Sequence, residues 1–141
     1  MGSRRRARIL SMQALFSWDY TRQSARELCE FPWLDEERRE NIKEDTLVFA
    51  RFIIMGVLEH IEEIDEILKQ RLEHWDFSRL GKVDLAILRI SIYSLRYQRE
   101  IPSSVTIDEG IDMAKRYSSE ESFRFINGVL DGVRKQFTDT V

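Results

Sequence analysis

The sequence contains few of the residues that build disulfide-bonded, cysteine-ligated or β-rich proteins. Cys29 is the only cysteine among 141 residues. It excludes an intramolecular disulfide and a zinc site made of cysteines, and it is typical of a reducing compartment. Only two prolines and six glycines are present. Because so few residues can form tight turns between strands, the composition favours helices.

Long hydrophobic segments are also missing. The longest strongly apolar run, residues 52–58, is far too short to span a bilayer. The arginines near the start are not followed by the uninterrupted apolar segment of a signal peptide, because Gln13, Ser17 and Asp19 break it. We therefore expect a cytoplasmic protein that has no membrane association.

Length and charge indicate a globular protein with a local excess of positive charge. A chain of 141 residues, 43% of them hydrophobic, can form one domain with its own core, and we expect a single domain over 1–141. The net charge is −3, so any nucleic-acid site must be local. Residues 1–8 form an Arg-rich segment with four arginines and no acid.

Hydrophobic residues recur every three or four positions through nearly the whole chain, which predicts an all-α fold of about seven helices and no strand. The long pattern over 47–72 exceeds an ordinary helix, so we expect a break near 59–62. The helix over 83–97 is apolar on more than one side and should be central. Three capping boxes are predicted to open helices, formed by Ser24 with Glu27, Thr106 with Glu109, and Ser118 with Glu121.

Residue types that perform catalysis do not converge in the sequence. His60 lies in the acidic stretch EHIEEIDE (59–66), which could be imagined as a metal site but is better interpreted as a solvated helix face. His74 suits the end of a helix, and Cys29 has no neighbouring base to activate it. The glycines are scattered singly, so no phosphate-binding loop is present. We expect no enzyme activity, no cofactor and no metal.

The arginines stand at the wrong end of a helix. Arg4, Arg5, Arg6 and Arg8 directly precede or begin the first amphipathic segment. Unpaired N–H groups already make a helix N-terminus positive, so bases are disfavoured there. The alternative interpretation is a solvated terminus without a function. A nucleic-acid phosphate backbone would supply the missing anion, so the cluster favours a local RNA or DNA site.

A second candidate lies near the start of the last helix. Phe125 is off the apolar stripe formed by Phe123, Ile126 and Leu130, and it follows Arg124. Such a pair could stack on an unpaired base and bind a phosphate. From these residues alone, packing of Phe125 against a neighbouring helix is slightly favoured, because an all-α protein has core on several sides.

Four segments together resemble the NusB family of transcription antitermination factors. They are RRRAR…QALFSWDY at the start, LGKVDLAILRISIYSL at 80–95, IPSSVTIDEGIDMAKRY at 101–117 and SFRFINGVLDGV at 122–133. The resemblance covers nearly the whole chain in order and is weakest between about 22 and 46. It implies one all-helical domain of two packed helical subdomains.

The resemblance also implies a function. Family members bind single-stranded boxA RNA together with NusE, a small-subunit ribosomal protein. The pair joins other Nus factors on RNA polymerase and suppresses premature termination, chiefly on ribosomal RNA operons. Members occur as a monomer or a homodimer, and in some dimers the contact covers the RNA surface.

Two sets of residues correspond to family positions. The RNA-binding set is Arg4, Arg5, Arg6, Arg8, Glu121, Arg124 and Phe125. Within it, Glu121 would repel phosphates and can only modulate affinity. The NusE-binding set is Phe16 and Asp84. Family members often have tyrosine where this chain has Phe16, so a hydrogen bond from that position is lost here.

Other classes of protein remain as alternatives. NusB-like domains also occur fused to ribosomal RNA methyltransferases, but 141 residues leave no room for the nucleotide-binding domain that such an enzyme needs. A self-associating structural protein could use the same arginine and aromatic surface. A DNA-binding helix-turn-helix is disfavoured, because no helix carries the exposed polar set that reads bases.

Overall fold

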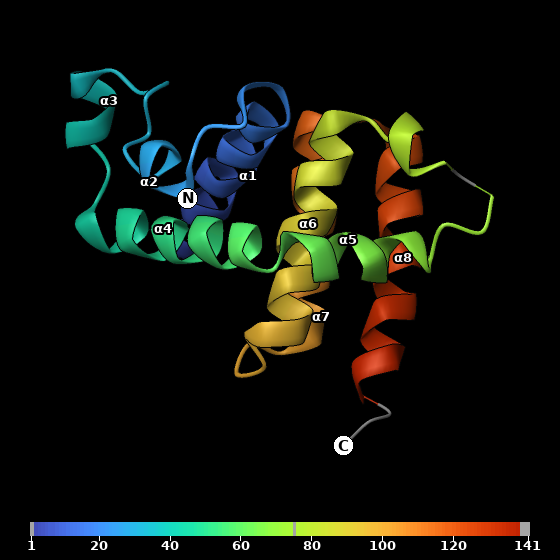
Figure 1. The fold of residues 1–141 in the computed structure, drawn as a ribbon. Helices are drawn as coiled ribbons and strands as arrows, with labels where there is room; N and C mark the ends of the chain where they lie inside the picture. Colours follow the sequence, from blue (N-terminus) through green and yellow to red (C-terminus); the bar gives the residue numbers. More distant parts are fainter. Residues whose placement is uncertain (1, 75, 139–141) are drawn as a thin grey trace. The chain divides into compact units, whose positions relative to one another are not determined.

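The computed structural model describes residues 2–74 and 76–138, and this part of the chain is helical without strands (Figure 1). The all-α prediction is confirmed. The helices are α1 (Ser3–Thr21), α2 (Ala25–Leu28), α3 (Glu36–Glu40), α4 (Glu44–Glu59), α5 (Ile61–Lys69), the 3-10 helix η1 (Phe77–Arg79), α6 (Lys82–Tyr97), α7 (Ser103–Tyr117) and α8 (Glu120–Thr138).

Two short helices, α3 and the 3-10 helix η1, were not among those predicted from the sequence. Helix α3 has five residues and buries none of them, so it leaves no apolar periodicity to detect. Its beginning is fixed by Asp35, whose carboxylate accepts a hydrogen bond from the backbone N–H of Arg38 at 2.8 Å.

The chain divides into two compact units, Met1–Glu59 and His60–Val141. This agrees with the two helical subdomains that the family resemblance implies. The long hydrophobic pattern breaks where it was expected, because α4 ends at Glu59 and α5 begins at Ile61.

In the first unit, α1 and α2 both pack against α4 (Figure 1). Ala7, Leu10 and Ala14 recur on one face of α1 and join Ala50 and Ile54 of α4 in one buried cluster. The hydroxyl of Ser11 donates to the carbonyls of Ala7 at 2.9 Å and Ala50 at 3.3 Å. This contact supplies the buried hydroxyl with acceptors on both helices.

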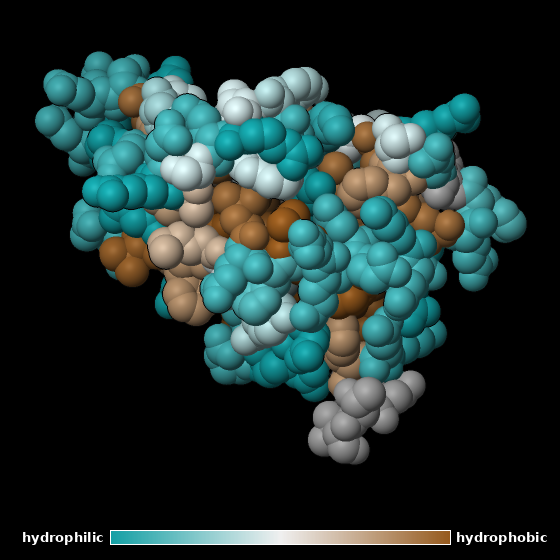
Figure 2. All heavy atoms as spheres, in the orientation of Figure 1, coloured by the Kyte–Doolittle hydropathy of each residue, from teal (hydrophilic) through white to brown (hydrophobic). Residues whose placement is uncertain are grey.

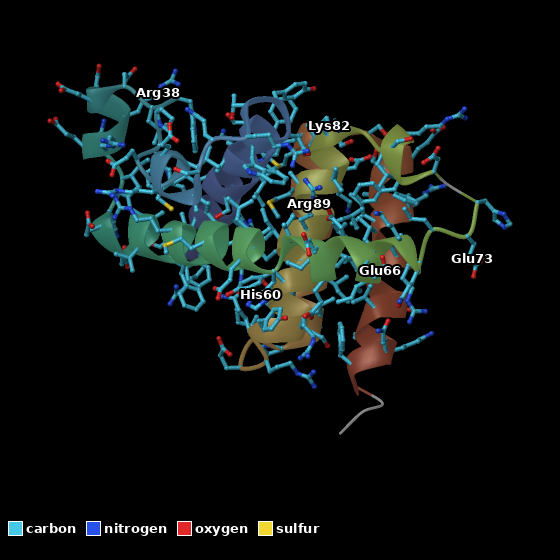
Figure 3. The ribbon with its side chains drawn as sticks, viewed as in Figure 1. Arg38, His60, Glu66, Glu73, Lys82 and Arg89 are labelled. Carbon is cyan, nitrogen blue, oxygen red and sulfur yellow. The ribbon has the colours of Figure 1, made fainter. Side chains whose placement is uncertain are left out.

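In the second unit, α6 is the central helix and contacts α5, α7 and α8. Residues 85–95 are all buried, which confirms the predicted central position. The guanidinium of Arg89 binds both carboxylate oxygens of Asp65, at 2.8 and 2.9 Å, and joins α6 to α5 (Figure 3). A Cβ added at Gly110 of α7 would lie 2.9 Å from the Ser91 hydroxyl, so glycine permits the close approach of these helices.

Of the three predicted capping boxes, only the first is confirmed. The Ser24 hydroxyl accepts from the backbone N–H of Glu27 at 3.1 Å, and the Glu27 carboxylate accepts from that of Ser24 at 3.3 Å. The box predicted at Thr106 is wrong. Helix α7 begins at Ser103, directly after Pro102, and the Pro102 carbonyl accepts from the N–H groups of residues 105 and 106.

The box predicted at Ser118 is also wrong, by one position. The Ser119 hydroxyl accepts from the backbone N–H of Ser122 at 3.2 Å and caps α8. The Ser118 hydroxyl instead donates to Asp84 at 2.7 Å. The Ser118 hydroxyl, which the local pattern predicted would cap α8, therefore binds a carboxylate 34 positions away in the sequence.

Candidate functional site

The predicted arginine cluster lies in the first turns of α1. The helix begins at Ser3, its N-cap is Gly2, which provides no side-chain hydrogen bond, and its first turn contains no acid. Arg4, Arg5 and Arg6 are exposed. Positive side chains therefore extend from an end of the helix that is already positive, which makes it a favourable place for an anion.

Phe49 of α4 lies beneath two of these arginines. The Arg4 guanidinium is 3.9 Å from the centre of the Phe49 ring, and that of Arg8 is 5.7 Å away. Arg8 is only 6% exposed, so it has little surface to offer a ligand. The stacked arrangement restricts Arg4 while its outer face stays accessible. Sequence reasoning missed Phe49, because no local pattern links residues 4 and 49.

In the second unit, Asp84, Glu121 and Phe125 lie around one shallow pocket of about 250 Å³. The remaining lining residues are Arg79, Leu80, Gly81, Ser119 and Ser122. Phe125 is half-buried and lines this pocket, which explains why it departs from the apolar stripe of α8. The structure thus brings together one residue of the predicted NusE-binding set and two of the RNA-binding set.

Two serines hold the carboxylate of Asp84. The hydroxyl of Ser118 donates to Oδ1 at 2.7 Å, and that of Ser122 donates to Oδ2 at 2.9 Å. Asp84 also lies in the first turn of α6, where the helix dipole favours a negative charge. These contacts fix the orientation of the carboxylate at the edge of the pocket.

Arg124 does not line the pocket. It is exposed on α8, and its guanidinium lies 6.0 Å from the ring centre of Phe123. Consecutive residues on an α-helix point about 100° apart, so the side chains of Arg124 and Phe125 point in different directions. The predicted pairing of these two side chains on one ligand therefore requires a ligand that reaches around the helix.

Phe16 is 38% exposed on α1 and pairs with Tyr20, one helical turn later. The two ring centres are 5.2 Å apart, and Tyr20 is 66% exposed. Together they form an exposed aromatic pair, which is typical of protein interfaces. Sequence reasoning named Phe16 alone, although the spacing of four residues could have identified Tyr20.

His60 and Cys29 are both packed against other side chains. His60 stacks on Tyr97 with ring centres 4.1 Å apart. Figure 3 shows His60 at the start of α5 and Glu66 further along the same helix. Burial raises the pKa of the Cys29 thiol, which keeps it protonated and unreactive. Across residues 2–74 and 76–138, no three His, Cys, Asp or Glu side chains are grouped to hold a metal ion. No described helix is long and apolar enough to cross a membrane.

The family model of the NusB family matches residues 5–135. The chain belongs to the NusB family. Transcription antitermination protein NusB of Treponema pallidum (strain Nichols) is 49% identical over 132 residues, which cover 94% of this chain and 92% of that protein. The protein of the same name from Treponema denticola is 40% identical over 134 residues, covering 94% and 96%.

Solved structures of NusB proteins have the same fold. NusB of T. maritima, at 38% identity, superposes with a TM-score of 0.82 over 94% of this chain and 90% of that one. A crystal structure of antitermination factors NusB and NusE in complex with dsRNA matches with a TM-score of 0.79 at 25% identity, covering 95% and 97%. The match to NusB extends over both units, since it includes α1 and α8.

Proposed function

We propose that this protein is a non-catalytic, RNA-binding transcription antitermination factor. It binds single-stranded boxA-like RNA from ribosomal RNA operons together with NusE, and the pair joins other Nus factors on RNA polymerase. The observation that carries this proposal is the first turn of α1, where exposed arginines surround a helix N-terminus without an acid. A solved relative, antitermination factors NusB and NusE in complex with dsRNA, supports NusE and an RNA as partners.

The arginines divide into two roles in this proposal. Arg5 and Arg6 are exposed and contact phosphates directly. Arg4 contacts RNA with the guanidinium face that Phe49 leaves accessible. Arg8, at 6% exposure, supports this arrangement over Phe49 more than it contributes to the contact. The RNA supplies the negative charge that a helix N-terminus favours.

The pocket beside α8 contributes selectivity more than affinity. Its two carboxylates, Asp84 and Glu121, outnumber the one lining arginine, Arg79, so a neutral base edge suits the pocket better than the phosphate backbone. Phe125 provides an aromatic surface for stacking, and Arg124 binds a phosphate on the adjoining face of α8. Stacking of a base on an aromatic side chain contributes about 1–3 kcal/mol.

NusE contacts each unit through a separate feature. On α1 the exposed aromatic pair of Phe16 and Tyr20 supplies apolar contact. On α6 the carboxylate of Asp84 accepts hydrogen bonds from the partner, in an orientation that Ser118 and Ser122 maintain.

Fluorescence anisotropy with a labelled boxA-like RNA tests the proposal. We expect binding that a scrambled RNA weakens, that NusE strengthens, and that Arg5→Ala with Arg6→Ala weakens by about tenfold or more. A matched control replaces two other exposed arginines of the same unit, Arg26→Ala with Arg38→Ala, and should retain binding. Equal binding of both RNAs, or equal loss in both double variants, would contradict the proposal.

A further inference from the structure

One face of α4 presents hydrophobic side chains to solvent. Val48, Phe52 and Met55 are 55%, 58% and 57% exposed, which is unusual for side chains of this size. They are spaced by four and three positions, so they form one continuous stripe along the helix. Figure 2 shows hydrophobic residues reaching the surface along α4. We define Val48, Phe52 and Met55 as the α4 stripe.

The α4 stripe is not part of the core of its own unit. The opposite side of α4 supplies Leu47, Ala50 and Ile54 to the buried cluster. One exposed apolar residue is ordinary, but a contiguous row of three on a regular helix is typical of an interaction site. The row has the spacing by which a second amphipathic helix is recognised.

A carboxylate lies at each end of the stripe. The same spacing continues to Asp45 on one side and Glu59 on the other, and both residues are exposed. They are fourteen positions apart in the sequence, which corresponds to about 21 Å along a helix. A partner that covers the stripe must therefore bring positive charge to both of its own ends.

This charge pattern decides between three possible occupants. An antiparallel second copy would place Asp45 against Glu59, and a parallel copy would place each carboxylate against its equal, so self-pairing is repelled in both orientations. RNA phosphates would meet the same carboxylates. A helix of a different protein with basic residues at both ends would be attracted by these carboxylates, whereas a second copy or an RNA backbone would be repelled.

We propose that the α4 stripe is a docking site for an amphipathic helix of another protein, with apolar residues at its centre and Lys or Arg near both ends. The α4 stripe shares no residue with the arginine cluster or with the lining of the pocket in the second unit. Arg4 lies beside it over Phe49, so a docked helix would border the proposed RNA contact without replacing it.

Two labelled synthetic helical peptides test this site on the full chain. Both carry leucines at the spacing of the stripe, one with lysines at its ends and the other with glutamates. We expect the lysine-ended peptide to bind more tightly by about fivefold or more. Phe52→Ser with Met55→Ser should weaken that binding by about tenfold, whereas Val105→Ser, an exposed apolar residue of α7, should not.

Reversing the charges at the ends of the stripe distinguishes specific docking from nonspecific hydrophobic binding of the peptides. In Asp45→Lys with Glu59→Lys the preference should reverse, so that the glutamate-ended peptide binds more tightly. Circular dichroism confirms that each variant keeps its helices. Equal binding of the two peptides, or a preference that the exchange leaves unchanged, would overturn the proposal.

Two further results would assign the stripe to another occupant and would also overturn it. One is a concentration-dependent dimer, measured by sedimentation, that Phe52→Ser abolishes. The other is a loss of RNA affinity in Phe52→Ser as large as that in Arg5→Ala with Arg6→Ala. Failure of the arginine variants alone would contradict the RNA proposal and leave the docking site standing.

Discussion

Two helix N-termini carry charges of opposite sign, one in each unit. At the start of α6, Asp84 is negative where the helix dipole favours a negative charge, and two serine hydroxyls donate to it. At the start of α1, the side chains are arginines, and the first turn contains no acid. The charge at α6 is stabilised by hydrogen bonds within the chain, whereas the exposed arginines at α1 oppose the helix dipole, a cost that an external anion would offset. We therefore infer that a polyanion suits the start of α1 better than the start of α6.

Reversing the charge at α1 should give the largest effect. We expect Arg5→Glu with Arg6→Glu to lower the affinity for boxA-like RNA by about a hundredfold or more at low salt, because two attractions become repulsions. Anisotropy titration measures the change. Placing glutamates at Arg26 and Arg38 gives the same change in net charge at exposed residues outside the arginine cluster. If that control lost as much affinity, the effect would come from net charge alone.

Removing the stabilised charge at α6 should have a smaller effect, and on a different property. Asp84→Ala removes two hydrogen bonds and a favourable interaction with the helix dipole, so the free energy of unfolding should fall by about 1–2 kcal/mol. Urea denaturation measures this loss, and titration with NusE should show weaker binding. Asp108→Ala, an exposed acid of α7, is the control. Equal stability of the two variants would show that the serine contacts contribute nothing.

The smallest effect should be a gain in stability without RNA. In Arg6→Glu the new charge suits the helix N-terminus, and it should stabilise the free protein by about a few tenths of a kcal/mol. Thermal unfolding at low salt measures the gain, which should shrink as salt is added. A loss of stability instead would mean that Arg6 makes contacts within the chain that outweigh the dipole.

Local patterns in the sequence predicted much of the fold. The apolar spacing located α1, the centrality of α6 and the break after Glu59, because each depends on which residues of one helix are buried. The box of Ser24 with Glu27 was predictable because both partners lie within one turn. Ser118 was misassigned because its partner, Asp84, comes from another helix.

In the candidate site, too, local features were predictable from the sequence and contacts between helices were not. Exposed arginines at the start of α1 follow from composition and helix position alone. The burial of Arg8 and the position of Arg4 over Phe49 depend on how α1 packs on α4, which no local pattern encodes. The pocket that joins Phe125 to Asp84 likewise depends on how α8 packs against α6. Contacts between residues distant in the sequence therefore account for what the sequence could not predict.

The most direct test of the central claim is the salt dependence of RNA binding. Each phosphate contact on single-stranded RNA contributes about 0.7 to the slope of log Kd against log salt concentration. If Arg5 and Arg6 each contact one phosphate, replacing both with alanine should reduce that slope by about 1.4, while Arg26→Ala with Arg38→Ala leaves it unchanged. A slope that the Arg5 and Arg6 variant retains in full would contradict the account, because the arginines at the start of α1 would then not contact the RNA backbone.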